Sequence, residues 1–258
     1  MLRYKSTKLH NRNIQTAIGT MKSLVLKRAS IACMVFWIVQ AGTTTEEYET
    51  GIDYHVLENK EEIEANESDS DSSEKITVIE YFSYGCLACK KFEVQISNWL
   101  ENKADDVEFK REAVVFQESW ALLAKAYYTA IELDVLDAVH IPMFEAIHED
   151  KRAMHEPKNI QQLFKEQAQI DPKVFRETFY EDDSIVDEIL KIHERVQSMG
   201  IKNTPSVVVD GKYLVNTRTA QSRKRIFLIV DFLTDKVRAD RRSVSTNEQK
   251  LPSSPPVL

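Results

Sequence analysis

The chain has 258 residues, of which 43% are hydrophobic and 29% are charged, with 7 prolines and 6 glycines. This composition excludes collagen-like, low-complexity and wholly disordered proteins, and it supplies enough apolar material for one large or two small domains. Three cysteines exclude a disulfide-dense scaffold and a four-cysteine zinc site. Because no apolar run reaches roughly 18–20 residues, no membrane-spanning helix is predicted.

The formal net charge of −7 is unevenly distributed along the chain. The first 41 residues contain seven lysines and arginines and no acidic residue, so the remainder carries 27 basic against 41 acidic side chains. Nucleic acids bind to basic surfaces because their phosphates are negatively charged. We therefore expect no nucleic-acid partner.

Residues 1–41 have the three parts of a secretory signal peptide. Met21 opens a basic segment, residues 31–39 form an apolar run, and small residues then precede a cleavage site after Ala41. We predict that Met21 is the true start and that the chain is cut after Ala41. One alternative is an amphipathic helix at the start of a cytosolic protein. Another is lipidation at Cys33, although the apolar run follows this cysteine instead of preceding it.

The first part of the exported chain, residues 42–116, has a strand–helix–strand pattern. Residues 58–75 are acidic and serine-rich, which is typical of a solvated loop. The segment that follows combines β-branched and aromatic residues without a breaker, which indicates a buried strand. Apolar residues then recur at helical spacing from Phe92. We predict strands at Tyr54–Leu57, Ile76–Phe82 and Val107–Phe116, and a helix that begins near Cys86.

The second half of the chain is helical first and returns to strands afterwards. Residues 117–199 show only helical spacing, and Gly200 follows the last apolar position. An Asp210-Gly211 turn between two β-branched segments predicts a hairpin, and an amphipathic helix follows it. We predict a small α/β domain interrupted by a helical domain. Its parts are residues 42–116 and 200–237 for the α/β domain, residues 117–199 for the helical insertion, and residues 238–258 for a disordered tail.

The sequence Cys86-Leu87-Ala88-Cys89 places two thiols one turn apart at the start of a helix. Unpaired N–H groups at a helix start stabilise an anion, so we expect Cys86 to ionise readily and Cys89 to be less exposed. A thiolate is the species that attacks disulfides. Half of a zinc site and a structural bridge are the alternatives. The zinc site lacks a second cysteine pair, and such a short loop gives a bridge little entropic benefit.

The segment Ile79–Glu93 resembles the active-site region of the DsbA-type thiol:disulfide oxidoreductases. Asn203-Thr204-Pro205, followed by Val-Val-Val-Asp-Gly, is similar to the family's proline loop and hairpin. The resemblance covers roughly residues 46–236 and implies a thioredoxin fold with an inserted all-helical domain. It also implies that Cys86 is the nucleophile and Cys89 the resolving cysteine.

The same resemblance implies roles for residues around the cysteines. Thr204 and Pro205 would bind substrate beside the disulfide, with Pro205 in the cis form; an ordinary trans proline is the alternative. Glu80 and its basic partner Arg111 would tune the active site from below, unless Glu80 points to solvent. Glu93 would be another tuning acid, unless it lies on a surface face of the helix.

The dipeptide Leu87-Ala88 departs from the Pro-His of the best-known family pattern, in which the histidine donates to the thiolate. Ala88 cannot donate a hydrogen bond from its side chain. We therefore predict that Cys86 is less acidic, and the disulfide less oxidising, than in that pattern.

The function that the resemblance implies is a periplasmic dithiol oxidase, which donates the Cys86–Cys89 disulfide to newly exported, incompletely folded proteins. A membrane quinone-linked partner of the DsbB type would reoxidise it. We expect no metal or organic cofactor and a monomer, and the six histidines have no metal-ligand spacing. A periplasmic reductase or isomerase of the same fold, kept open by Thr204 and the unusual dipeptide, is one alternative. A non-catalytic peptide-binding chaperone module is another.

Overall fold

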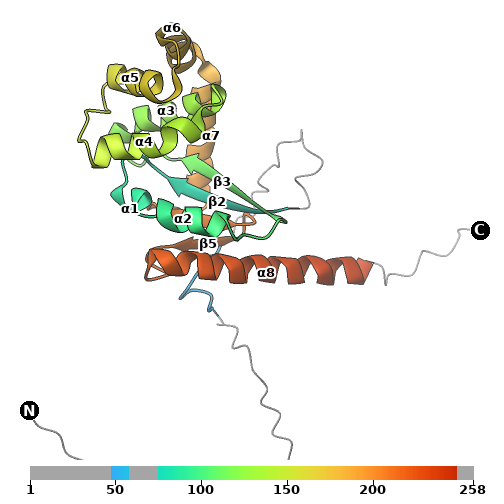
Figure 1. Ribbon diagram of the computed structural model, residues 1–258. Coiled ribbons are helices and arrows are strands. Elements are labelled where there is room, and N and C mark those ends of the chain that lie inside the picture. The colour runs from blue at the N-terminus through green and yellow to red at the C-terminus, as the bar shows by residue number, and fades with distance from the viewer. Residues whose placement is uncertain (1–47, 58–74, 249–258) are drawn as a thin grey trace, which may run out of the picture. The chain divides into compact units, whose positions relative to one another are not determined.

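The computed structural model describes residues 48–57 and 75–248 (Figure 1). The predicted signal peptide and most of the acidic loop lie outside the described residues. A five-stranded sheet has the order β1-β5-β4-β2-β3, in which β2 and β3 are parallel and the other neighbours are antiparallel. The strands are β1 (His55–Val56), β2 (Ile76–Phe82), β3 (Val107–Ala113), β4 (Ser206–Val209) and β5 (Tyr213–Asn216).

The strand β2 lies between two neighbours and is buried on both faces, as its run of Ile, Val, Tyr and Phe predicts. Its register places Glu80 opposite Arg111 of β3 on one side and Val207 of β4 on the other. The predicted hairpin is present, and Asp210 and Gly211 both have positive φ in its turn, as a tight hairpin turn requires.

The helices fall into two groups along the chain. Two near the active-site segment are α1 (Leu87–Lys90) and α2 (Glu93–Leu100), and the last is α8 (Arg223–Glu248). Between β3 and β4 the chain forms a 3-10 turn (Glu118–Trp120), α3 (Ala121–Glu132), α4 (Leu136–His148), α5 (Pro157–Ala168), α6 (Pro172–Arg176), a π-helical turn (Glu177–Glu181) and α7 (Asp183–Ser198). This block contains helices and no strand, as predicted, and all of it is described.

The sheet separates two hydrophobic cores. On one face α2 and α8 pack against β2, β4 and β5, with Phe92 and Trp99 both stacked on Phe227. On the other face Ile79 and Val208 belong to a core that continues into the inserted helices. The helical block is therefore joined to the sheet by a continuous apolar core.

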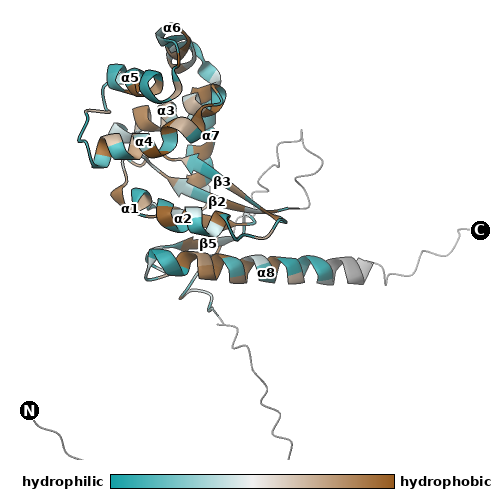
Figure 2. Ribbon diagram, viewed as in Figure 1, coloured by the Kyte–Doolittle hydropathy of each residue, from teal (hydrophilic) through white to brown (hydrophobic). Residues whose placement is uncertain are grey.

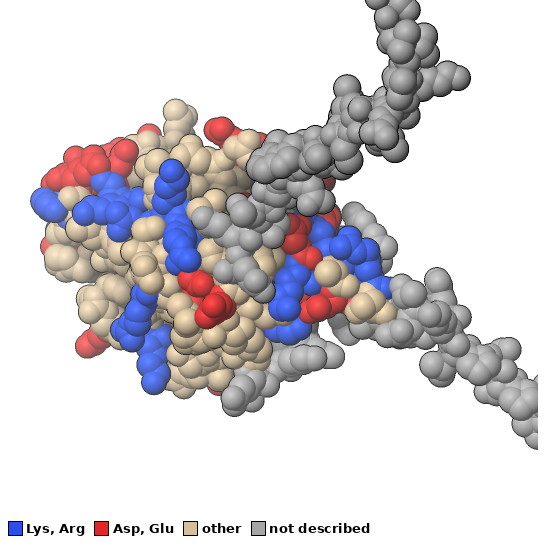
Figure 3. All heavy atoms as spheres, turned by 90° about the horizontal axis from the view of Figure 1, so that it is seen from below, with Lys and Arg blue, Asp and Glu red and all other residues tan. Residues whose placement is uncertain are grey.

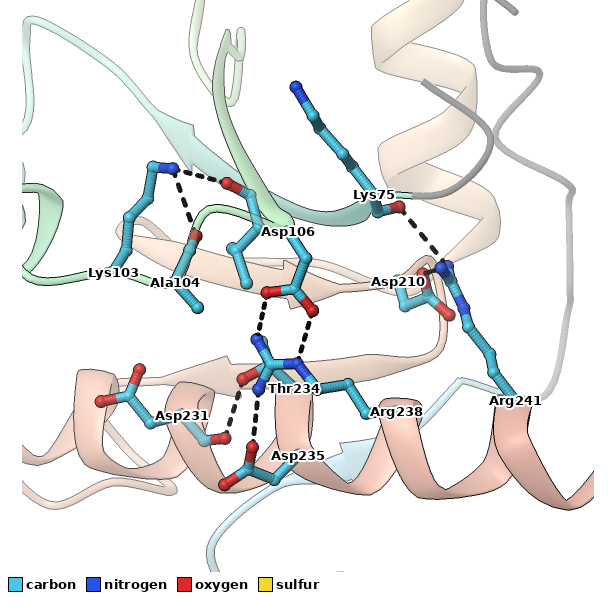
Figure 4. A network of polar contacts seen from close by, with 11 residues as sticks. Lys75, Lys103, Ala104, Asp106, Asp210, Asp231, Thr234, Asp235, Arg238 and Arg241 are labelled. Atoms are coloured by element: carbon cyan, nitrogen blue, oxygen red, sulfur yellow. Dashed lines mark hydrogen bonds and ion pairs between the residues drawn. The ribbon is translucent and has the colours of Figure 1, made fainter. Parts of the chain in front are cut away.

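The prediction of a disordered tail from residue 238 is wrong for residues 238–248, because α8 continues to Glu248. Apolar spacing ends at Val237, and in Figure 2 hydrophobic and hydrophilic residues alternate along the first half of α8, whereas the coloured part that follows is mainly hydrophilic. The extension has no proline or glycine, and its arginines form ion pairs: Arg238 with Asp106 and Asp235, and Arg241 with Asp210 (Figure 4). Charge pairing stabilises a helix that apolar periodicity alone does not predict.

No helix among the described residues is both long enough and apolar enough to cross a bilayer.

Candidate active site

The loop between β2 and α1 presents Cys86 at the start of a helix. The Ser83 hydroxyl oxygen accepts from the Gly85 N–H at 3.1 Å, and the Ser83 carbonyl accepts from the Cys86 N–H at 3.0 Å. Cys86 is the N-cap of α1, and its sulfur accepts from the Cys89 N–H at 3.3 Å. The helix α1 is a single turn, rather than the start of the continuous helix that the sequence predicts. Lys91 and Phe92 form a turn between α1 and α2, although both keep right-handed helical dihedral angles.

Gly85 is required by close packing immediately before the nucleophile. A Cβ atom at this position would lie 2.4 Å from Nε1 and 2.7 Å from Cδ1 of the Trp120 indole. The indole comes from the short 3-10 turn that opens the helical block. The start of the inserted helical block therefore contacts the loop that carries Cys86.

The two sulfurs differ sharply in their surroundings. Both are free thiols in this structure; Cys86 is partly exposed, whereas Cys89 is fully buried. The pKa of Cys86 is lowered to about 6, chiefly by hydrogen bonding from the Cys89 side chain, with further help from Thr204 and from backbone N–H groups at Ala88 and Cys89. The pKa of Cys89 is raised well above its ordinary value, mainly because burial disfavours the thiolate.

The proline loop lies beside the exposed sulfur. The Thr204–Pro205 peptide bond is cis, as predicted. The Cys86 sulfur lies 3.6 Å from the Thr204 carbonyl oxygen, although 118 residues separate them in sequence. A single turn and a single loop thus place Cys86, Thr204 and Pro205 together.

A carboxylate lies beneath the cysteines, in the middle of the sheet. Glu80 is 0% exposed, and its Oε2 lies 3.3 Å from Nε of Arg111, its neighbour on β3. Arg111 also contacts Glu93, with Nη2 3.0 Å from Oε2. Two acids therefore share one guanidinium, which cannot fully balance both negative charges.

The surroundings of Glu80 favour its protonated form. Burial raises the pKa of Glu80 well above its ordinary range, and the nearby Glu93 carboxylate raises it further, while Arg111 acts in the opposite direction. An ionised Glu80 would in turn raise the pKa of the Cys89 thiol. The acid that acts on Cys89 therefore holds its proton more firmly than an ordinary glutamate does.

The structure decides between the alternatives for both acids. Glu80 does not point to solvent, and Glu93 is 7% exposed and does not lie on a surface face. Leu87 and Ala88 lie between the cysteines, and the Leu87 side chain is 49% exposed beside Cys86. Lys90 forms an ion pair with Glu149, the residue that follows α4.

Sequence reasoning missed two residues of the site, Tyr84 and His140. The Tyr84 hydroxyl lies 3.0 Å from Nδ1 of His140, and Nε2 of His140 lies 3.3 Å from Oε1 of Glu93. His148 also contacts this loop, with Nε2 2.8 Å from the Tyr84 carbonyl oxygen. Fifty-six residues separate Tyr84 from His140, so no local pattern could pair them. Within the described part of the chain, no three His, Cys, Asp or Glu residues are grouped as metal ligands.

A cysteine pair at a helix start, with a cis-proline loop beside it and an acid below, defines the thiol:disulfide exchange proteins of thioredoxin fold. Comparison with known proteins agrees. A family model described as Thioredoxin matches residues 69–227. The thiol:disulfide interchange protein DsbA of Burkholderia cepacia is 28% identical over 188 residues, which cover 73% of this chain and 85% of the relative. DsbA of Pseudomonas aeruginosa is 29% identical over 165 residues, covering 64% and 77%.

Solved structures give the same result. The crystal structure of Pseudomonas aeruginosa DsbA superposes with a TM-score of 0.67 at 27% identity, covering 76% of this chain and 97% of that one. A DsbA1 structure from Neisseria meningitidis has a TM-score of 0.61 at 25% identity. The chain belongs to the thioredoxin family, as a DsbA-type thiol:disulfide oxidoreductase with a helical insertion.

Proposed function

We propose that this protein is a periplasmic dithiol oxidase that donates the Cys86–Cys89 disulfide to newly exported, incompletely folded proteins. One observation carries the proposal. The pKa values of two cysteines three residues apart are shifted in opposite directions, since that of Cys86 is lowered to about 6 and that of Cys89 is raised. A stable thiolate at Cys86 makes this sulfur a good leaving group, which favours transfer of the disulfide to a substrate.

The reaction has two exchanges. A substrate thiolate attacks the sulfur of Cys86; a substrate–Cys86 bond forms and the Cys86–Cys89 bond breaks. A second substrate thiolate then attacks the substrate sulfur of this mixed disulfide, and Cys86 leaves as a thiolate. Two electrons pass from the substrate dithiol to the enzyme, which ends as a dithiol.

Glu80 is proposed to supply the proton in the first exchange. Cys89 leaves as a thiolate in a buried site where its pKa is raised, so it must be protonated promptly. The acid that acts electrostatically on Cys89 is Glu80, whose pKa is raised, and Arg111 and Glu93 adjust how firmly Glu80 holds its proton. In the reverse direction the ionised Glu80 would accept the Cys89 proton.

Thr204 and Pro205 are proposed to bind substrate. Their loop lies at Cys86, and its backbone can pair with an extended peptide in the manner of an added strand. The exposed side chain of Leu87, the residue after Cys86, can add an apolar contact to such a peptide. An extended segment of an incompletely folded chain has its backbone free for this pairing.

Ala88 is proposed to leave the disulfide less oxidising than a Pro-His dipeptide would. The variant Ala88→His adds a donor near the Cys86 thiolate and is expected to raise the reduction potential by about 30–60 mV, the equivalent of one hydrogen bond to a charged group. Equilibration with glutathione measures this. Ala88→Leu is the size control, and a potential unchanged or lowered in the histidine variant would contradict the assignment.

The cellular setting extends the proposal. The family resemblance supports export by cleavage of residues 1–41, with Met21 as the start, and reoxidation by a membrane quinone-linked partner of the DsbB type. We propose a monomer that needs no metal or organic cofactor and no nucleic acid. On the face seen in Figure 3, basic and acidic side chains are interspersed rather than gathered into a basic patch.

A matched pair of variants tests the function. Cys89→Ser should trap a covalent complex when a reduced, unfolded peptide with a single cysteine is added after activation of Cys86 as a mixed disulfide, because neither Cys89 nor a second peptide thiol can then resolve it, whereas Cys86→Ser should trap none. The oxidised wild-type protein should convert a two-cysteine version of this peptide to its disulfide, and its own reduction potential should lie above about −200 mV. A potential well below that value would indicate a reductase. Undiminished activity of Cys86→Ser in cells would indicate a chaperone module.

A further inference from the structure

The turn that presents the nucleophile consists of Ser83, Tyr84, Gly85 and Cys86. Its ends are joined by the hydrogen bond from the Cys86 N–H to the Ser83 carbonyl, and Gly85 has a negative φ, as the third residue of a type I turn does. A type II turn differs by rotation of the central peptide, here the one between Tyr84 and Gly85, and requires a positive φ at the third residue. Glycine adopts either sign of φ readily, so Gly85 itself does not select between the two orientations.

Two side chains hold this central peptide by its two polar ends. The Gly85 N–H donates to the Ser83 hydroxyl oxygen at 3.1 Å, and Nε2 of His148 lies 2.8 Å from the Tyr84 carbonyl oxygen. Rotation of the peptide would break both hydrogen bonds together. Tyr84 is 1% exposed, so without His148 its carbonyl oxygen is left buried and without a donor, which is an unfavourable state.

The chemistry of the contact defines the state of His148. A carbonyl oxygen can only accept a hydrogen bond, so the proton between the two groups is carried by Nε2. Burial lowers the pKa of His148, its bond to the Tyr84 carbonyl raises it, and the charges of Lys90 and Lys151 lower it further. The net shift is downward, so the imidazole is a neutral donor at pH 7. The Phe144 ring stacks beside it, with the ring centroids 6.2 Å apart.

Other residues of the insertion restrain the same part of the chain. The Trp120 indole packs so closely on Gly85 that a Cβ atom there would lie 2.4 Å from its Nε1. A rotated peptide turns a different side of Gly85 toward this ring, so that either the indole or the backbone of Cys86 must move. Glu149, the residue after α4, forms an ion pair with Lys90 of α1. The end of α4 therefore contacts the chain both before and after Cys86.

We propose that His148 is a positioning residue for the disulfide exchange: by donating from Nε2 it keeps the Tyr84–Gly85 peptide in one of its two orientations, and thereby keeps the Cys86 sulfur in place beside the proline loop. This inference rests on the proposed oxidase function, since exchange at Cys86 is the reaction that it serves. Without the donor the rotated turn becomes populated. Only the molecules with the unrotated turn then react at the full rate, so the observed rate falls with their fraction.

Crystal structures of the reduced variants test the orientation of the peptide directly. His148→Leu removes the donor, His148→Gln retains an N–H at a similar place, and His155→Leu is the control, because it alters an exposed histidine between α4 and α5. In His148→Leu the Tyr84 carbonyl should be rotated in part or all of the molecules, with a positive φ at Gly85. The glutamine variant and the control should keep the unrotated peptide. In the wild type, long-range ¹H–¹⁵N spectra of the imidazole should show His148 neutral with its proton on Nε2.

Rapid mixing of each oxidised variant with a reduced, unfolded peptide measures the consequence for exchange. The second-order rate constant should fall about fivefold in His148→Leu, which corresponds to the loss of one ordinary hydrogen bond. It should return to within about twofold of the wild-type value in His148→Gln, because a neutral amide replaces the donor. His155→Leu should react like the wild type.

Three results would overturn the proposal. The first is an unrotated peptide in His148→Leu, and the second is a wild-type imidazole with its proton on Nδ1. The third is an equal loss of rate in His148→Gln, because a role that depends only on the size of the ring would not be rescued by an amide. If the leucine variant does not fold, Ser83→Ala removes the other hydrogen bond of the same peptide and should also populate the rotated turn; an unrotated peptide there would again refute the idea.

The orientation of the peptide is measured without catalysis, so it separates this inference from the proposed function. A wild-type protein that fails to oxidise peptide thiols, combined with a rotated peptide in His148→Leu, would refute the oxidase function alone. An active oxidase whose leucine variant keeps the unrotated peptide would refute the role of His148 alone.

Discussion

Two clusters in this molecule both combine carboxylates with arginines, but they lie in opposite environments. The redox-site cluster, made of Glu80, Glu93, Arg111 and His140, is buried. The helix clamp, made of Asp106, Asp210, Asp235, Arg238 and Arg241, faces solvent on α8 and the turns beside it (Figure 4). In the clamp Arg238 contacts both oxygens of Asp106 at 2.6 Å, and these bonds lower the pKa of Asp106.

The clusters differ in how completely their atoms are paired. Neither oxygen of Glu80 has a hydrogen-bond partner of good geometry among the described residues, and its contact with Arg111 is 3.3 Å. A buried acid with weak partners is held neutral, whereas a solvated acid with strong partners is held ionised. Full pairing in the clamp therefore secures a helix, while incomplete pairing at the redox site leaves a proton available for chemistry.

The largest expected effect comes from removing the shared cation. Arg111→Met leaves the Glu93 charge buried without its guanidinium and should lower the free energy of unfolding by about 3–5 kcal/mol at pH 7. Urea titration of the reduced protein measures the loss. Arg195→Met, which breaks the Arg195–Glu112 pair at the edge of the insertion, is the matched control, and an equal loss in both variants would contradict this prediction.

A smaller effect of opposite sign is expected at Glu80. Its pKa is raised in the folded state, so the folded protein binds more protons than the unfolded one above the unfolded pKa of about 4.3, and stability falls as the pH rises through the interval between the two pKa values. Glu80→Gln removes that penalty and should stabilise the reduced protein by about 1–3 kcal/mol at pH 8, with little gain at pH 4. Unfolding curves at both pH values test the sign. A variant destabilised at pH 8 would show that the wild-type carboxyl is ionised.

The smallest effect is expected in the helix clamp. Arg238→Met should cost about 0.2–1 kcal/mol, the usual value of a surface ion pair. Its main consequence should be local: faster amide hydrogen exchange in residues 238–243, since none of these residues belongs to the buried apolar core that ends at Val237 in this part of the helix. Lys236→Met, on the exposed side of the same helix, should leave the exchange unchanged. Equal protection in wild type and Arg238→Met would mean that intrinsic helix propensity suffices.

Much of the fold was predictable because its signals are local. The β-branched run of β2, the Asp210-Gly211 turn and the helical spacing of residues 117–199 are each readable within a short window. Two errors have physical causes. The α8 extension carries ion pairs with Asp106 and Asp210, which are distant in sequence, and at the break between α1 and α2 Phe92 is buried against residues of α8 that are equally distant.

The site residues that lie in a continuous sequence motif were predictable, whereas those that only the fold brings together were not. Cys86, Cys89 and the proline loop stand in recognisable motifs. The burial of Glu93 and the approach of His140 depend on how α4 packs over the sheet. One hint was present in the sequence: a strand as apolar as β2 accepts a carboxylate only when other polar groups surround it, and such groups had to come from elsewhere in the chain.

The single-turn length of α1 has a consequence for how the nucleophile responds to its medium. The groups that stabilise the Cys86 thiolate are all in direct contact: the Cys89 thiol, the Thr204 side chain and two backbone amides. Mobile ions screen fields over distances near 10 Å at 0.1 M but not contacts between neighbouring atoms. The reactivity of this sulfur should therefore be nearly independent of ionic strength, so that the enzyme would work alike in dilute and in saline surroundings.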